Sequence, residues 1–270
     1  MTYGEFYSQT SEKIGRREVL LLLEFVTGKN DAWLLLHKET VLGDSDFERL
    51  KGLAERRLSG EPLQYILGEW DFCGLTFKVD KRVLIPRPET ELLVMEALKC
   101  PARILDVCTG SGCIAVSIKM LAEIQVDVTA VDISQDALEL AAENAKRLGA
   151  EVKFVQSDLL ENVVGFFDII VSNPPYITTE EMQKLEPTVR DFEPNLALHG
   201  GFDGMDLYRR LIPQAAEKLK PGGLLLLEIG PPEVLEIMQQ YGFTDIKIKN
   251  DYANLPRILT GHFQNTSLIL

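Results

Sequence analysis

The hydrophobic positions of the first sixty residues repeat at helical spacing. Apolar residues crowd most of the surface of a helix expected over 18–27, which Gly28 ends. A second helix is expected after Ser45 and Glu48, which have the Ser-x-x-Glu spacing of a capping box, and Gly60 closes it. A helix that is apolar on several sides needs helical neighbours. We therefore expect residues 1–62 to form a small helical domain that binds a partner.

Beyond this domain the pattern changes to short apolar runs with strand character. Residues 63–82 read as a linker with a β-hairpin, in which two strands over 69–79 flank Cys73 and Gly74. In the region 83–270 the strands are expected at 103–107, 126–131, 152–155, 167–171, 224–229, 243–249 and 258–263. Helical patterns over 136–148 and 205–219, the latter ending at Pro221-Gly222-Gly223, separate the earlier strands. This alternation predicts an α/β domain with a parallel sheet, and the missing helix between the last two strands requires one of them to run antiparallel.

A glycine-rich turn joins the first of these strands to a helix. Gly110 and Gly112 permit a tight turn and a close backbone approach, so the helix N-terminus can meet a polar group of a ligand. The Gly110-x-Gly112-x-x-Ala115 spacing also fits a dinucleotide fingerprint, and Asp132 lies 20 residues beyond Gly112. The turn alone fits NAD and S-adenosyl-L-methionine equally well.

Three acidic residues follow three successive strands around this turn. Asp106 would repel a pyrophosphate but can engage an ammonium group, directly or through water. Asp132 is placed to accept both ribose hydroxyls, and Asp158 suits the adenine amino group, with Leu159 against the ring. Each acid taken singly is better explained as a helix N-cap. Three together favour a cationic adenosyl cofactor.

The segment Asn173-Pro174-Pro175-Tyr176 ends a short, buried, β-branched strand. The Asn173 side chain and the Pro174 carbonyl offer two acceptors to a planar NH2 group, because proline keeps its acceptor while lacking a donor. Tyr176 would pack on the plane of that group. The alternative is that the two prolines only end the strand with turn chemistry.

These two motifs together resemble class I methyltransferases that act on a planar nitrogen. Further segments narrow the likeness: 61–68, the Pro-Arg-Pro-x-Thr-Glu run at 86–91, and Glu193-Pro194-x-x-Ala197-Leu198 with Gly200-Gly201. They resemble the release factor glutamine N5-methyltransferases, the PrmC/HemK family. The resemblance implies a class I, Rossmann-like, seven-stranded mixed sheet with an N-terminal helical domain and a linking hairpin. It also implies methyl transfer from S-adenosyl-L-methionine, with S-adenosyl-L-homocysteine as product, to the Gln of the Gly-Gly-Gln motif in class 1 peptide chain release factors.

The resemblance assigns roles to individual positions. Asn173, Pro174 and Tyr176 are expected to be catalytic, and with Pro175 they bind the substrate. The cofactor is expected to meet Asp106, Cys108, Thr109, Gly110, Ser111, Gly112, Asp132, Asp158, Leu159 and Asn173. Cys108 stands where the family often has Gly, and Leu159 where an aromatic is common. Arg87, Thr90 and Glu91 are expected to organise a loop near the site, with Thr90 capping a helix, and Glu228 to serve as a cap or in a salt bridge.

Composition limits the remaining function classes. A net charge of -13 over 270 residues works against nonspecific attraction to nucleic acid. Cys73, Cys100, Cys108 and Cys113 form no CxxC pair, which favours reduced thiols in a cytoplasmic protein. His37, His199 and His262 lack ligand spacing, so no metal is expected, and we expect a monomer with no membrane segment. Three alternatives stay open: a nucleic-acid amino (adenine-N6 or guanine-N2) methyltransferase, an NAD-dependent dehydrogenase, and a non-catalytic binding module.

Overall fold

The computed structural model describes residues 1–98 and 103–264. Its chain forms two compact units: Met1–Glu69 with Glu186–Phe192, and Trp70–Leu185 with Glu193–Leu270. The domain boundaries at 62 and 82 stay predictions. Cys100 lies outside the described residues, whereas Cys73, Cys108 and Cys113 are free thiols. No helix in the described ranges is long and apolar enough to cross a membrane.

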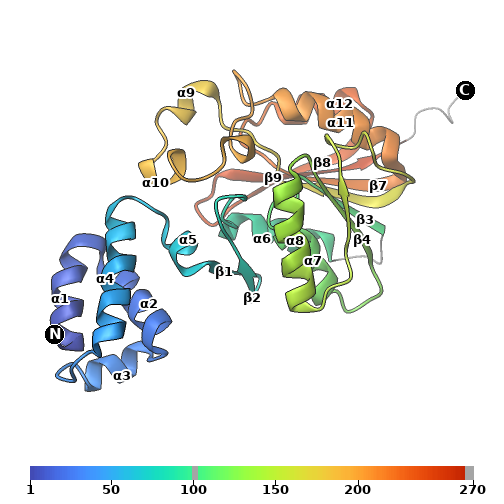
Figure 1. Cartoon of the computed structure of the whole chain (residues 1–270). Helices are drawn as coiled ribbons and strands as arrows, with labels where there is room; N and C mark the ends of the chain where they lie inside the picture. Colours follow the sequence, from blue (N-terminus) through green and yellow to red (C-terminus); the bar gives the residue numbers. More distant parts are fainter. Residues whose placement is uncertain (99–102, 265–270) are drawn as a thin grey trace, which may run out of the picture. The chain divides into compact units, whose positions relative to one another are not determined.

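The first unit is built from helices around one apolar core, as predicted (Figure 1). The helices are α1 Tyr3–Ile14, α2 Arg16–Thr27, α3 Asp31–Leu36, α4 Asp44–Leu58 and α5 Leu63–Leu67. Gly28 ends α2 in the left-handed conformation, as its sequence position suggested. The predicted capping box is wrong, because α4 begins at Asp44 with Gly43 as its N-cap. Ser45 therefore already lies inside the first helical turn.

A hairpin of β1 Glu69–Phe72 and β2 Leu75–Lys78 follows, which confirms that prediction. Cys73 and Gly74 both have positive φ angles, 51° and 73°, as a two-residue hairpin turn with the right twist requires. The Cys73 N–H donates to Glu91 Oε1 at 2.8 Å. Glu91 thus anchors the hairpin turn to the start of α6 (Glu91–Ala97).

A seven-stranded mixed sheet forms the centre of the second unit, with the order β5-β4-β3-β6-β7-β9-β8 (Figure 1). The strands are β3 Arg103–Val107, β4 Asp127–Asp132, β5 Lys153–Gln156, β6 Phe167–Ser172, β7 Leu219–Glu228, β8 Phe243–Asn250 and β9 Pro256–Phe263. Strand β9 runs opposite to the other six and pairs antiparallel with both β7 and β8, in agreement with the prediction that one of the last two strands is antiparallel. Strand β7 begins earlier than predicted and contains Pro221, because Leu219 already pairs with Phe167 of β6.

Helices cover both faces of this sheet. On one face pack α6, α7 (Cys113–Leu121) and α8 (Gln135–Leu148), and on the other α11 (Asp206–Lys218) and α12 (Val234–Gln240). Successive strand residues alternate between the two cores: Ile169 and Val171 face α6 and α7, while Ile170 faces α11. Short helical turns complete the unit: η1 Pro88–Thr90, α9 Thr179–Met182 and η2 Asn195–Ala197, whereas α10 Pro187–Arg190 groups with the first unit.

The sheet topology fixes where a ligand can bind. From β3 the strand order runs one way through β4 to β5 and the other way through β6 to β7. Ligands of open α/β sheets bind at the carboxyl ends of the strands where this order reverses. The glycine-rich turn and Asn173 follow β3 and β6, so both lie at this point. Ser172 pairs with Leu227, which brings the end of β7 beside Asn173.

Candidate functional site

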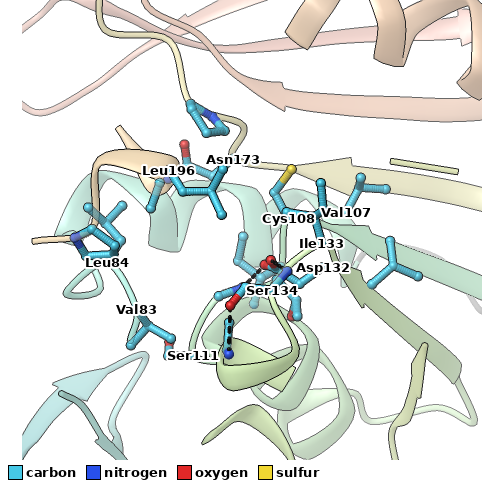
Figure 2. Close-up of a pocket in the computed structure, with 18 of the residues that line it drawn as sticks. Val83, Leu84, Val107, Cys108, Ser111, Asp132, Ile133, Ser134, Asn173 and Leu196 are labelled. Carbon is cyan, nitrogen blue, oxygen red and sulfur yellow. Dashed lines mark hydrogen bonds between the residues drawn. The ribbon is translucent and has the colours of Figure 1, made fainter. Parts of the chain in front are cut away.

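A cavity of about 320 Å³ lies at these strand ends, within the size range of small-molecule sites (Figure 2). Nine predicted positions line it: Cys108, Thr109, Gly110, Ser111, Asp132, Asp158, Leu159, Asn173 and Pro175. Figure 2 shows Asn173 on one side of this space and the Asp132–Ser134 turn on another. Four predicted residues, all within the described ranges, are not among the lining residues: Asp106, Gly112, Pro174 and Tyr176.

The glycine-rich turn is held by hydrogen bonds from both sides. The Thr109 N–H donates to the Val131 carbonyl at 3.0 Å, and the Gly110 N–H donates to Asp132 Oδ2 at 2.9 Å. Gly112 has a φ of 79°, and a Cβ on it would lie 3.0 Å from the Ala141 Cβ on α8. Gly112 therefore permits close packing behind the turn. An added Cβ at Gly110, in contrast, would have no neighbour within 4 Å, so that backbone is open to a ligand.

Asp132 combines loop support with a free face on the cavity. Besides Gly110, its carboxylate accepts from the Ser134 N–H through Oδ1 at 2.9 Å (Figure 2). Burial raises the pKa of Asp132, and these N–H donors oppose the rise. Each oxygen keeps a second lone pair. The residue can hold the turn and still accept hydroxyl protons from a ligand.

Asp106 lies behind the turn. Its fully buried carboxyl accepts from the Thr109 hydroxyl at 2.6 Å and the Ala115 N–H at 3.2 Å, both at Oδ2. Oδ1 has no hydrogen-bond partner, and burial raises the pKa of Asp106 to about 7. Engagement of a ligand ammonium group by Asp106, directly or through water, stays a prediction. Its unpaired Oδ1 remains an acceptor for a contact through water.

Cys108 and Leu159, the two site residues that depart from the family pattern, both have a positive φ angle. Cys108 has a φ of 62° and Leu159 a φ of 50°, both in the left-handed region that favours glycine. This conformation explains a preference for Gly at position 108. Burial raises the pKa of the Cys108 thiol, which is therefore neutral.

Three arginines line the cavity, and each is paired with a carboxylate. Arg210 Nη2 lies 2.7 Å from Asp158 Oδ2, and Arg82 Nη2 lies 2.7 Å from Asp80 Oδ2. Arg87 Nη2 lies 2.5 Å from Oε1 of the buried Glu193. The paired arginines add no free positive charge for a pyrophosphate, which the backbone N–H groups of a glycine-rich turn can also bind. The pairing alone therefore does not separate the two cofactors.

Glu193 was not predicted as a site residue. In addition to Arg87, its Oε2 accepts from the Ile85 N–H at 3.1 Å. Both partners belong to the loop that carries the Pro-Arg-Pro-x-Thr-Glu run. Glu193 therefore supplies the contact that holds this loop against the cavity, and the loop role expected for Arg87 agrees with it.

Asn173 takes part in a hydrogen-bonded chain. Its Nδ2 donates to Thr90 Oγ1 at 3.2 Å, and the Thr90 hydroxyl donates to Glu228 Oε2 at 2.6 Å. Thr90 occupies the predicted N-cap position of α6, but its hydroxyl makes no cap hydrogen bond to that helix. Its own backbone is already helical (φ −67°, ψ −21°), whereas a capping residue is typically extended, and its hydroxyl donates to Glu228. Glu228 was a candidate site residue for which a cap or a salt bridge was the preferred expectation. Its sequence signal was an acidic residue at the end of a strand, because Glu228 ends β7 and Asn173 follows the neighbouring strand β6.

Tyr176 is held in the protein interior. Its hydroxyl donates to Glu228 Oε1 at 3.2 Å and accepts from Arg257 Nη1 at 3.2 Å. Burial, together with the Glu228 carboxylate, raises its pKa. The ring does not line the cavity, so packing on a substrate amide stays a prediction for Tyr176.

Three glycines enclose this tyrosine. A Cβ at Gly200 would lie 2.6 Å from Tyr176 Cα, one at Gly204 2.3 Å from Tyr176 O, and one at Gly230 2.5 Å from Tyr176 Cδ2. Real Cβ atoms do not approach other atoms so closely. The three glycines let the 198–204 loop and the end of β7 close around the chain that carries Asn173.

Metal ligation receives no support. Among the described residues, no three His, Cys, Asp or Glu side chains gather as a metal site. His199 lines the cavity, where its Nε2 lies 2.9 Å from Thr179 Oγ1. Sequence reasoning had not placed this histidine at the site.

Comparison with known proteins decides the family. A model of the PrmC N-terminal domain matches residues 8–68, and one of the methyltransferase small domain matches residues 88–190. A release factor glutamine methyltransferase of Geobacter sulfurreducens is 42% identical over 254 residues, covering 91% of this chain and 89% of that protein. Another, from Koribacter versatilis, is 44% identical and covers 89% of each. The chain belongs to the release factor glutamine methyltransferase family.

Members of this family are S-adenosylmethionine-dependent methyltransferases, and the fold agrees. A crystal structure of a methyltransferase from Pyrococcus furiosus matches with a TM-score of 0.55 at 20% identity, covering 71% of this chain and 90% of that one. The cavity also fits the cofactor: an open glycine turn, an accepting Asp132 and no unpaired lining arginine suit a cationic nucleoside. The predicted fold and family are both confirmed.

Proposed function

We propose that this protein methylates the side-chain amide nitrogen, N5, of the Gln in the Gly-Gly-Gln motif of class 1 peptide chain release factors. The observation that carries the proposal is the Asn173 amide, which lines the cavity while its NH2 group is held by Thr90. Its oxygen is thereby left to accept from a substrate. The names of the two bacterial relatives supply the identity of that substrate.

Orientation is the main requirement of this reaction. An amide nitrogen is a poor nucleophile, because its lone pair is delocalised into the carbonyl. Asn173 Oδ1 and the Pro174 carbonyl would accept its two hydrogens and fix its plane, with Pro175 and Tyr176 shaping the recess. Fixing reacting groups in place contributes as much as about 7–11 kcal/mol in favourable cases. No strong general base is required in this scheme.

The cofactor side of the site is proposed in the same way. Residues Cys108 to Ser111 would border the ligand through their backbone, Asp132 would accept the ribose hydroxyls, and Asp158 with Leu159 would hold the adenine. S-adenosyl-L-methionine supplies the methyl group when bound. As the new N–C bond forms, the C–S bond breaks, S-adenosyl-L-homocysteine leaves, and the amide nitrogen loses one proton to water.

The proposal includes the setting of the reaction. We place the protein in the cytoplasm, in agreement with the free thiols of Cys73, Cys108 and Cys113. We also propose that it acts as a monomer. The net charge of -13 and the paired arginines of the cavity speak against a nucleic-acid substrate.

A competition assay tests the proposed substrate. The whole protein is incubated with methyl-labelled cofactor, an unmodified release factor, RNA and DNA in one mixture. Label is expected in the release factor alone, and Asn173→Ala is expected to lose about 10²–10³-fold in turnover while still binding S-adenosyl-L-homocysteine. Label in nucleic acid but not in the release factor would reject the proposal. Full turnover of Asn173→Ala would reject the role of the recess.

A further inference from the structure

The chain of hydrogen bonds from Glu228 to Asn173 has a fixed direction. Burial raises the pKa of Glu228, and the Thr90 hydroxyl, the Arg257 charge and the Tyr176 hydroxyl oppose the rise by stabilising the ionised form. The ionised carboxylate only accepts, and the single Thr90 hydroxyl proton goes to Glu228 Oε2 at 2.6 Å. The Thr90 oxygen can therefore only accept from Asn173, whose Nδ2 lies 3.2 Å away. A flipped Asn173 would place its oxygen against an oxygen that has no proton left to give. The chain thus excludes one of the two amide orientations.

The other oxygen of Glu228 is engaged as well. Tyr176 donates to Oε1 at 3.2 Å, and the Tyr208 hydroxyl donates to the Glu228 main-chain carbonyl at 2.8 Å. Arg257 contacts the Tyr176 hydroxyl and is itself held by Asp251 Oδ2 at 3.0 Å. Glu228 is only 2% exposed, so its carboxylate has little freedom to rotate. Glu228, where this series of hydrogen bonds begins, is therefore held as firmly as the Asn173 amide, where it ends.

We propose that Glu228 and Thr90 are positioning residues that set the Asn173 amide with its oxygen toward the substrate NH2. This inference rests on the proposed function. With the opposite orientation, the Asn173 NH2 would face the NH2 group of the glutamine, donor against donor. Of the two positioning residues, Glu228 lies at the end of β7, and Thr90 lies on the turn before α6, where it also lines the cavity.

Variants at Thr90 separate hydrogen bonding from packing. Thr90→Val keeps the shape and removes the hydroxyl, and kcat for release factor methylation is expected to fall about 10–100-fold, the scale of a misplaced reacting group. Thr90→Ser keeps the hydroxyl and is expected to stay within about threefold of the unaltered protein. The dissociation constant of S-adenosyl-L-homocysteine is expected to change less than about twofold in both, because Thr90 acts through Asn173.

A double substitution tests whether the two residues act as one unit. Asn173→Ala is expected to cost much less in kcat on a Thr90→Val background than alone, because the orientation is already lost. Equal losses on both backgrounds would overturn the inference, as would a Thr90→Ser variant as slow as Thr90→Val. Thr90→Val with unchanged kcat would also overturn it. If the unaltered protein does not methylate the release factor at all, the proposed function itself fails, which is a distinct result.

Discussion

Gly200 offers the sharpest test of how the fold holds the recess. Its φ lies outside the left-handed region, so an alanine there meets no intrinsic backbone penalty. The added Cβ would lie 2.6 Å from Tyr176 Cα and 2.7 Å from the Pro175 carbonyl oxygen. Both are main-chain atoms that cannot rotate away. Gly200→Ala therefore isolates the close approach of two chain segments from backbone strain.

The distances give the size of the expected effect. Ordinary contact begins at 3.4 Å, so the 2.6 Å approach is short by about 0.8 Å. Overpacking of this kind typically costs about 1–3 kcal/mol in unfolding free energy. If the displacement is taken up by the segment Pro175–Tyr176, Asn173 moves with it, and a misplacement near 1 Å can cost about 10²-fold in rate.

The assay measures kcat for release factor methylation, the dissociation constant of S-adenosyl-L-homocysteine and the thermal midpoint for Gly200→Ala. Gly52→Ala is the matched control, because Gly52 is exposed in the middle of α4 and its Cβ would have no neighbour within 4 Å. The control is expected to raise stability by about 0.5–1 kcal/mol and leave kcat unchanged. Gly200→Ala is expected to lower kcat and the midpoint while cofactor affinity is kept. An unchanged kcat and midpoint would refute this view of the recess.

Three further predictions concern the glycine-rich turn and its supports. Cys108→Gly should be more stable than Cys108→Ala by about 1 kcal/mol in urea denaturation, because alanine keeps the left-handed strain; equal stabilities would contradict it. Burial raises the pKa of Asp106 from 3.8 in the unfolded chain to about 7 in the folded protein. The stability that protonated Asp106 contributes is therefore fully present below pH 3.8 and is lost as the pH rises to about 7. Between about pH 5 and pH 8 the midpoint of the unaltered protein should therefore fall relative to Asp106→Asn, and parallel curves would count against it. Buried Asn144 bonds the Lys78 N–H, the Lys78 carbonyl and the Ser111 carbonyl, so Asn144→Ala should cost at least about 3 kcal/mol, while the exposed Asn250→Ala should change stability by less than about 0.5 kcal/mol.

The parts of the fold that were predictable depend on local patterns. Short buried strands bracketed by helices with glycine ends determine the parallel part of the sheet, and the missing helix before β9 determines its antiparallel strand. The glycine turn, Asp132 and Asn173 were likewise placed by their position at strand ends, which topology brings to one edge. These features could be predicted because each depends on residues that are close together in the sequence.

The parts that were not predictable depend on contacts between distant residues. Thr90 follows a pattern typical of a helix cap, yet its hydroxyl goes to Glu228, 138 positions away. The beginning of β7 was set by pairing with Phe167, which overrode the Pro-Gly-Gly signal for a loop. The enclosure of Tyr176 by three glycines also requires the folded arrangement. Local propensity could not reveal these three features.

The proposed presentation of a glutamine side chain to the cofactor by the Asn173 recess can be measured directly. The measurement is tandem mass spectrometry of a release factor after incubation with this protein and S-adenosyl-L-methionine. One added methyl group is expected on the Gly-Gly-Gln peptide, located on the glutamine side chain, and with Asn173→Ala it is expected to form about 10²–10³-fold more slowly. A methyl group on another residue, or an unmodified peptide in the presence of protein that binds the cofactor, would contradict it.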